Sequence, residues 1–278
     1  MINMMKADFY RIFRGMGIYI GITVMLGMIA MSIYAVSPGS VGVHISSGTE
    51  MNNELSDMSY EEINHMSMSE FRKYMLETRN YKLDKDILSA NVNLYYIFIF
   101  VGAVLVTADF SGGCIKNTLS SAISRKKYYI SKLVIVNLCC VALHFLNTYI
   151  MYFANLIFNN RNLASSIGTV TQITLLQLPP MLAFGCILTG LAFLLKKTAA
   201  FNTVTIPLII VIQTLWRFLS FILKLPEKIS EFEFQNMIMK LANAPGTTYM
   251  TQSYLFCAVI IIAAILLGWV FFKKAEIR

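Results

Sequence analysis

Charged side chains are scarce in this chain. Asp, Glu, Lys and Arg make up 14% of its 278 residues, whereas hydrophobic residues make up 56%, and the mean hydropathy is +0.61. A soluble globular domain carries about 25% charged residues, so the composition excludes that class and indicates an integral membrane protein. The net charge of +8 does not point to nucleic acid, because the cations stand at the ends of apolar segments and not together on one polar surface.

The motifs of common catalytic and metal sites are also missing. The five cysteines form no C-x-x-C pair and the three histidines form no H-E-x-x-H, which argues against a disulfide framework, a zinc site and a metalloprotease. No G-x-x-x-x-G-K-[ST] occurs, so the chain has no P-loop for ATP. We therefore expect no catalytic residue, no metal and no cofactor within this chain, and we do not expect an enzyme.

Long apolar runs are what the sequence has in abundance. A bilayer core about 30 Å thick needs roughly 20 apolar helical residues to cross it, and six runs come close to that length: 17–36, 91–108, 133–158, 167–195, 203–223 and 254–272. The first run is predicted to be retained as a span and not cleaved as a secretory signal, because it is long, follows a 16-residue leader and lacks an A-x-A-like site.

Lysine and arginine predict the orientation of these spans. With the N-terminus inside, the inner segments hold 13 of the 23 cationic residues beside three acids, whereas the outer segment 37–90 holds five cations and nine acids. Cationic segments stay on the cytoplasmic side. The sequence thus predicts an all-α polytopic protein of the cell membrane, with six transmembrane helices and both termini cytoplasmic.

Three segments outside the spans have their own patterns. The leader, 1–16, places Phe9, Ile12 and Phe13 at helical spacing, which predicts an amphipathic elbow helix along the inner headgroups; a plain extension of the first span is the alternative. The large outer segment 37–90 contains two capping boxes, at 59–62 and 67–70, which predict two short helices. The outer segment 224–253 fits an amphipathic hairpin partly inserted in the membrane.

Polar side chains and prolines interrupt the middle spans. Pro179, Pro180 and Pro207 lie within predicted spans, where proline kinks a helix and frees a carbonyl. The intramembrane polar residues either line a transport pathway or form hydrogen bonds between helices. The candidates for lining a pathway are Asn137, His144, Asn147, Gln172, Gln177 and Gln213.

The inner segment 109–132 is basic and punctuated by glycine. Gly112 and Gly113 permit a sharp reversal, and the residues that follow are predicted to form one or two short helices with an apolar face and exposed cations. Such a segment suits docking into a groove on another protein or anchoring to anionic lipid. The pattern alone leaves both open.

The order of residues in this segment resembles a known family. An acid, glycines, then Ile-Lys-Asn-Thr-Leu-Ser, Ile-Ser-Arg, a tyrosine-rich turn and Ser-Lys-Leu is similar to the loop after the second span of ABC-2 type transporter permeases. The leader KADFYRIFR is similar to their elbow helix, and the layout of spans matches theirs. The resemblance implies a coupling loop that contacts a separate ABC ATPase subunit, which binds ATP and Mg. The residues it assigns to that contact are Lys116, Asn117, Thr118, Leu119, Ser124 and Arg125.

The large first outer segment narrows the resemblance to one group of permeases. The chain is similar to those of bacitracin-resistance and lantibiotic self-protection systems, which work as dimers of like or related subunits and expel membrane-active peptides. The resemblance implies an exporter of an amphipathic antimicrobial peptide or drug. A membrane sensor or scaffold that recruits a cytoplasmic regulator without transport is the alternative.

Overall fold

The computed structural model describes residues 2–36, 88–115, 123–158, 166–222, 231–243 and 246–274. All regular secondary structure in these ranges is helical. Most of the predicted outer segment 37–90 lies outside them, including both predicted capping-box helices, and so do Lys116, Asn117, Thr118 and Leu119 of the predicted coupling loop.

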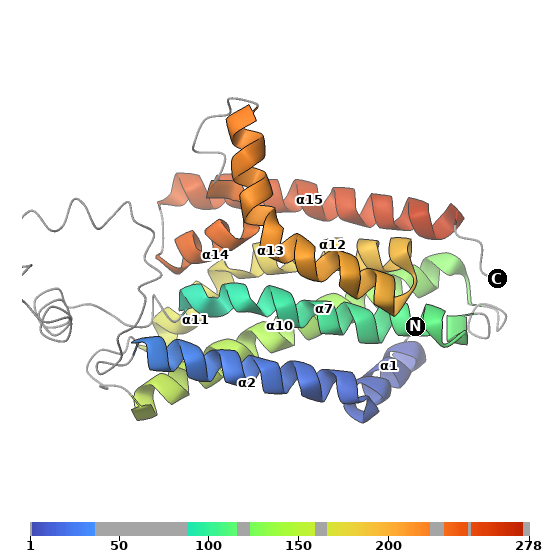
Figure 1. Cartoon of the computed structure of the whole chain (residues 1–278), viewed down its shortest axis with the longest axis horizontal. Coiled ribbons are helices and arrows are strands. Elements are labelled where there is room, and N and C mark those ends of the chain that lie inside the picture. Colours follow the sequence, from blue (N-terminus) through green and yellow to red (C-terminus); the bar gives the residue numbers. More distant parts are fainter. Residues whose placement is uncertain are drawn as a thin grey trace, which may run out of the picture.

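The chain begins with two helices joined at a glycine. α1 (Ile2–Arg14) and α2 (Met16–Val36) are separated by Gly15, and Figure 1 shows α1 inclined to the axis of α2. The hydroxyl of Tyr19 donates to the carbonyl of Phe13 at 2.6 Å, which satisfies a backbone acceptor at the end of α1. The prediction of a separate helix before the first span is confirmed.

Five of the described helices are long and apolar enough to cross a membrane. They are α2, the helix over Ala90–Ser111, α10 (Arg125–Phe158), α12 (Leu178–Leu195) and α15 (Thr247–Lys274). The second of these runs through η2 (Ala90–Asn93), α7 (Leu94–Gly102), the π-helical turn η3 (Ala103–Thr107) and α8 (Ala108–Ser111). α13 (Thr198–Ile222) contributes a shorter described apolar stretch, Thr198–Ile212.

The predicted span 167–195 is not one helix. It divides into α11 (Ile167–Leu176) and α12, with a turn at Gln177. Pro179 and Pro180 have no backbone N–H to donate to the preceding turn, but they fit the first turn of a new helix. The hydroxyl of Tyr254 donates to the carbonyl of Leu176 at 3.2 Å. The predicted interruption by proline is therefore confirmed, and it goes as far as dividing the run into two helices.

The predicted loop 109–132 is shorter than expected. α10 begins at Arg125, so the positions from 125 to 132 belong to a 34-residue helix and not to separate short helices. The reversal falls at Gly112 and Gly113, where Gly113 has a φ of +68°, a conformation that glycine adopts without strain.

The spans lie side by side along the long axis of the molecule (Figure 1). α12 packs against α15, α10 and α7, and its contact with α15 is close because Gly190 faces Gly268: a Cβ added to Gly268 would lie 3.0 Å from the Cα of Gly190. Small residues let apolar helices approach in this way. α13 contains Pro207, and Figure 1 shows it changing direction part-way and leaving the bundle axis.

Different elements form the two ends of the bundle. At one end lie α1, α8, the start of α10 and the end of α15 (Figure 1), which we call the α1 end. At the other lies α14 (Phe234–Ala242) beside η2 and α11. The apolar residues Met237, Ile238 and Leu241 of α14 are buried within the protein, whereas the sequence predicted insertion into the membrane.

Candidate functional site: a buried charge cluster

Four charged side chains from three elements meet at the α1 end. Asp8 and Arg11 are three residues apart on α1, so they share one face of that helix. Asp109 lies in α8, close to where the second span ends, and Lys132 lies two turns into α10. We call these four residues the charge cluster.

Each cation in the charge cluster contacts both acids. The Nζ of Lys132 lies 2.6 Å from Oδ1 of Asp8 and 2.7 Å from Oδ2 of Asp109. Arg11 places Nη2 2.8 Å from Oδ1 of Asp8 and pairs Nη1 with Oδ1 of Asp109. The hydroxyl of Tyr128 donates to Oδ2 of Asp109 at 2.6 Å. Two positive and two negative charges therefore form a closed, neutral set.

Three members of the charge cluster are buried and the side chain of Arg11 is 33% exposed, so the pairing of the buried three matters for stability. Asp8 and Asp109 are each 5% exposed and Lys132 is 1% exposed. Removing one member of a buried ion pair leaves an uncompensated charge in a medium of low dielectric constant, which costs about 3–5 kcal/mol. The three elements are thus held in one relative arrangement as long as all four charges stay together.

Arg11 remains charged in this environment. Desolvation by burial would lower the pKa of its guanidinium, but the hydrogen bond to Asp109 and the charges of Asp109 and Asp8 outweigh it, so the pKa is raised above its ordinary value. Within the part of the chain that the structure describes, Oδ2 of Asp8 and Nε of Arg11 have no hydrogen-bond partner. A network that is only partly satisfied is less stable than a complete one.

The charge cluster lies next to the segment that connects α8 to α10. Asp109 comes just before the reversal at Gly112, and Lys132 follows the start of α10 by seven residues. The charge cluster therefore ties α1 to the two helices on either side of residues 112–124. A force applied to that segment would act on the charge cluster through helices that are rigid over such short distances.

The described part of the predicted coupling loop contains Ser124 and Arg125. Both are exposed. The hydroxyl of Ser124 accepts a hydrogen bond from the backbone N–H of Lys127 at 3.4 Å, as an N-cap residue does. Arg125 donates from Nη1 to the carbonyl of Lys273 at 2.9 Å. Their contact with a partner protein stays a prediction.

The predicted elbow residues face different surroundings. Ile12 is buried and Phe9 is half-buried, whereas Phe13 is exposed. Arg11, on the same helix, turns inward to the charge cluster.

Most of the predicted pathway residues take part in hydrogen bonds between helices. Asn147 donates to Oδ1 of Asn91 at 2.8 Å, and Asn91 donates to Oε1 of Gln177 at 2.7 Å. Gln177 in turn donates to the carbonyls of Leu88 and Ile238. These buried amides connect η2, α10, the turn before α12 and α14. These are the hydrogen bonds between helices that the structural alternative predicts, and a role in lining a pathway stays a prediction.

The other members of that predicted set are spread through the structure. His144 is buried, and its Nε2 lies 3.1 Å from the carbonyl of Thr174. Asn137 donates to the carbonyl of Leu133 and contacts Sγ of Cys186. Gln172 is exposed, and the side chain of Gln213 lies outside the described residues. These residues do not gather at one site.

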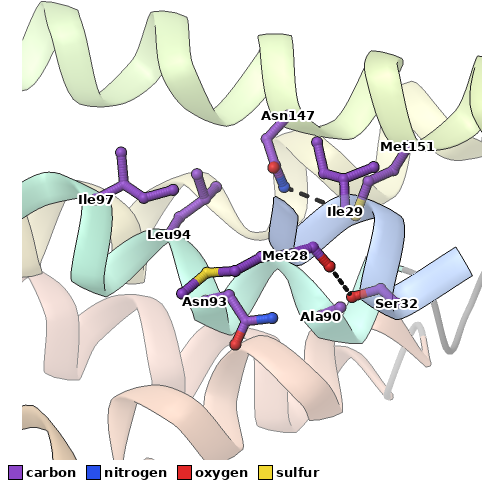
Figure 2. Close-up of a pocket in the computed structure, with 9 residues that line it drawn as sticks. All are labelled: Met28, Ile29, Ser32, Ala90, Asn93, Leu94, Ile97, Asn147 and Met151. Atoms are coloured by element: carbon purple, nitrogen blue, oxygen red, sulfur yellow. Dashed lines mark hydrogen bonds between the residues drawn. The ribbon is translucent and has the colours of Figure 1, made fainter. Parts of the chain in front are cut away.

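Asn147 also lines a small pocket between α2, η2, α7 and α10. Figure 2 shows Asn147 and Met151 on one side of this pocket and Met28, Ser32 and Asn93 on another. The remaining lining is Ile29, Ala90, Leu94 and Ile97. Asn147 is the one predicted pathway residue among the residues that line it.

Sequence reasoning missed the charge cluster and Asn91. Asp109 and Lys132 were counted as charges of an inner loop, and Asn91 was treated as the first residue of a span. The sequence does show that Asp8 and Arg11 share one face of a helix, and that Tyr128 and Lys132 share one face of another, because residues three or four apart lie on the same side. It does not show that the face with Asp8 and Arg11 contacts the face with Tyr128 and Lys132.

Comparison with known proteins places most of the chain in one family. Residues 85–278 match the family described as "Protein of unknown function (DUF2705)". The chain belongs to this family. The DUF2705 match includes Asp109, Tyr128 and Lys132, whereas Asp8 and Arg11 precede it, so the charge cluster joins the DUF2705 region to α1. No curated protein matches the chain.

Proposed function

We propose that this chain is the membrane-spanning permease subunit of an ABC-2 type exporter. A separate ATPase subunit would bind ATP and Mg, and a second permease subunit, identical or related, would complete the transporter. The cargo would be an amphipathic antimicrobial peptide or drug, and the role would be self-immunity or resistance. The membrane would be the bacterial cytoplasmic membrane.

The observation that carries this proposal is the charge cluster. It joins the elbow helix α1 to both helices that flank residues 112–124, the segment that the family resemblance assigns to ATPase contact. A permease driven by a partner must convert a push on that segment into movement of its spans. A clamp in which each carboxylate pairs with the buried Lys132 and the partly exposed Arg11 is suited to transmit such a push as a rigid-body movement of three elements.

The topology of the proposal has six spans and both termini in the cytoplasm. The pair α11 and α12 would make one interrupted span and α13 another. Exposed cations gather at the α1 end, on Arg14, Arg125, Lys126, Lys127, Lys273 and Lys274, and the positive-inside rule assigns that end to the cytoplasm. The acidic segment 37–90 would then face outward and offer a cationic peptide a first contact, limited by screening to about 8 Å at physiological salt.

The transport cycle would use ATP bound by the ATPase subunit to shift the permease between two conformations. Shifting a two-state equilibrium almost completely requires about 5.5 kcal/mol of differential binding. The nucleotide-driven contact at residues 112–124 would supply that difference. A sensor or scaffold, the alternative function, would need no nucleotide-dependent rearrangement.

Affinity purification from native membranes tests the proposal. The tagged chain is purified in mild detergent, its stoichiometric partners are identified, and ATP hydrolysis is assayed. We expect a P-loop ATPase to co-purify, to be lost with Arg125→Glu, and to be retained with Lys197→Glu, which makes the same charge change at another exposed position of the α1 end. Retention of the ATPase by Arg125→Glu would refute the role of Arg125.

The same experiment separates the two functions. Recovery of the wild-type chain alone, or with a signalling protein and without ATP hydrolysis, would contradict the transporter and favour the scaffold. Nanodisc extraction, which preserves lipid contacts, provides the control for loss of a weak complex in detergent.

A further inference from the structure

The turn between α12 and α13 holds a lysine in a conformation that glycine usually adopts. Only Lys196 and Lys197 separate the two helices, and Lys196 has a φ of 59° and a ψ of −41°. Among the described residues it is the one residue other than glycine with a positive φ. The backbone N–H of Lys197 donates to the carbonyl of Leu195 at 2.6 Å, which closes a γ-turn of the rare and strained form. The Cβ of Lys196 therefore raises the free energy of this turn.

Three hydroxyl groups fasten the start of α13 to the end of the second span. The Oγ1 of Thr198 lies 3.0 Å from Oγ1 of Thr107 and 3.2 Å from Oγ of Ser111, and the backbone N–H of Thr198 donates to Oγ of Ser111 at 3.4 Å. The hydroxyl of Thr107 donates to the carbonyl of Ala103 at 2.8 Å. Because each hydroxyl has one proton, Thr198 donates to Thr107, and Ser111 donates to Thr198. We call Thr107, Ser111 and Thr198 the hydroxyl latch.

The buried face of α13 lies in its inner half, beside the second span. Phe201 and Ile209 are buried there, and a Cβ added to Gly102 would lie 3.0 Å from the ring of Phe201. Beyond Ile209, by contrast, Phe218 and Phe221 are 61% and 82% exposed, and Figure 1 shows this half of α13 leaving the bundle axis. The position of α13 thus depends on its inner half, where the hydroxyl latch lies.

The strained turn and the hydroxyl latch act on the same short connection. A link of two residues has little freedom, so the place at which Thr198 is held fixes the backbone of Lys196. A lysine released from that restraint would return to a negative φ, as residues with a Cβ do, and the start of α13 would move with it. A glycine would have no strain to lose. The bonds of the hydroxyl latch therefore oppose the strain of the turn.

We infer that the turn at Lys196 is a strained hinge that the hydroxyl latch holds closed, and that opening the latch lets the turn relax and moves the inner half of α13 relative to the second span. This goes beyond the proposed function, because two arrangements of the chain would serve an exporter and a sensor alike. Ser111 directly precedes Gly112, and Asp109 of the charge cluster lies in the same short helix, α8. A contact made at residues 112–124 can therefore act on the hydroxyl latch through Ser111.

A cycle of two substitutions tests the link between the strain and the hydroxyl latch. Lys196→Gly removes the strain, and Thr198→Val removes the central hydroxyl. We expect Lys196→Gly to raise the unfolding temperature of the otherwise wild-type chain by about 2–4 °C. In the Thr198→Val background the turn has already relaxed, so Lys196→Gly should give no increase. Thermal unfolding of the full-length protein in detergent measures all four chains.

Each substitution has a matched control in the same part of the chain. Lys197→Gly makes the glycine change at a residue whose φ is not positive, and it should lower the unfolding temperature in both backgrounds, because glycine raises the entropy of the unfolded chain. Thr203→Val makes the other change at an exposed position of α13, and it should leave the effect of Lys196→Gly unaltered. Ser111→Ala, which removes an exposed hydroxyl of the latch, takes the place of Thr198→Val if that variant does not fold.

Distances between spin labels test the movement itself. Labels on Lys127→Cys and Thr203→Cys, at two exposed positions, report on α10 and α13 in a Cys114→Ser background, in which the other cysteines are half-buried or buried. We expect one distance while the hydroxyl latch is intact and a second population after Thr198→Val. That population should become smaller when Lys196→Gly is added, because the strain that favours the open arrangement is then absent.

Three results would overturn the inference. An equal gain from Lys196→Gly with and without the hydroxyl of Thr198 would show that the latch does not hold the strain. No gain in either background would show that the turn is not strained. A single, unchanged distance after Thr198→Val would show that α13 has no second arrangement. Neither measurement needs an ATPase or a cargo, so both are independent of the test of the proposed function.

Discussion

At the scale of single residues, the role of a polar side chain in this protein depends on whether it is buried and on which side chains it contacts there. Lys132 is almost fully buried and reaches two carboxylates, while Lys127, five positions earlier in the same helix, is exposed. Burial makes the pairing of Lys132 obligatory, because an unpaired charge there has neither water nor a counter-ion.

Neutralising Lys132 tests the charge cluster. We expect Lys132→Met to lower the free energy of unfolding by about 3–5 kcal/mol, because the acids Asp8 and Asp109 would then share one cation. Adding Asp8→Asn should restore part of that loss, since Arg11 and Asp109 remain as a balanced pair. Thermal unfolding of the detergent-solubilised protein measures both, with Lys127→Met as the exposed control. Strictly additive losses in the double variant would show that Asp8 and Lys132 do not interact.

The buried amides allow a second test at this scale. Asn147→Leu removes a donor to Asn91 and leaves the buried Oδ1 of Asn91 unpaired, which should destabilise the protein by about 1–2 kcal/mol. Gln172→Leu, at an exposed position of α11, should leave the unfolding temperature unchanged. If Asn147→Leu preserved stability but reduced export, Asn147 would act in a pathway, which is the other of the two roles that the sequence left open.

At the scale of the helices, close approach depends on small residues at the contact of α12 and α15. A Cβ on Gly268 would lie 2.6 Å from the hydroxyl of Tyr129 and 3.0 Å from the Cα of Gly190. The tyrosine can move, but the backbone of α12 can give way only if the two helices separate. Gly268 is therefore required by the packing of the two helices.

Substituting this glycine should separate the helices. We expect Gly268→Ala to destabilise the fold by about 1–3 kcal/mol through overpacking. Gly27→Ala on α2 is the matched control, because nothing lies within 4 Å of its added Cβ, and alanine there should be neutral or stabilising by up to about 1 kcal/mol. Unfolding temperatures of the two variants give the comparison. Equal stability of both would mean that α12 and α15 are not in close contact in the membrane.

At the scale of the whole molecule, the placement of charge favours the proposed orientation. Most of the described cations collect at the α1 end, which also holds α1 and the end of α15, whereas Lys240 of α14 lies at the other end. An arrangement with both ends of the chain on one side requires an even number of crossings. The proposed six spans satisfy this, with α11 and α12 counted as one crossing.

Cysteine accessibility tests that orientation. Cys114 is exposed at the α1 end, while Cys139, Cys140, Cys186 and Cys257 are half-buried or buried. We expect a membrane-impermeant maleimide to label intact cells weakly and opened membranes strongly, and Cys114→Ser to abolish the difference. A cysteine introduced by Ser47→Cys on the Cys114→Ser background should instead be labelled in intact cells. Strong labelling of Cys114 in intact cells would invert the topology.

The sequence by itself determined that this is a helical membrane protein and where most of its spans lie, because an apolar run of about 20 residues has few alternatives to a membrane helix. It also determined the separate first helix, the interruption at Pro179 and Pro180, and the reversal at Gly112 and Gly113. Each of these depends on the backbone chemistry of residues that are neighbours in the chain.

Only the tertiary structure decided what the polar residues do. Asp109 and Lys132 looked like two charges of one inner loop, until packing brought them to Asp8 and Arg11. Asn147 and Gln177 looked equally suited to a pathway or to hydrogen bonds until Asn91 was found between them. The physical reason is the same in each case: an ion pair or a buried hydrogen bond between distant segments is set by the way helices pack, and no local periodicity records which faces meet.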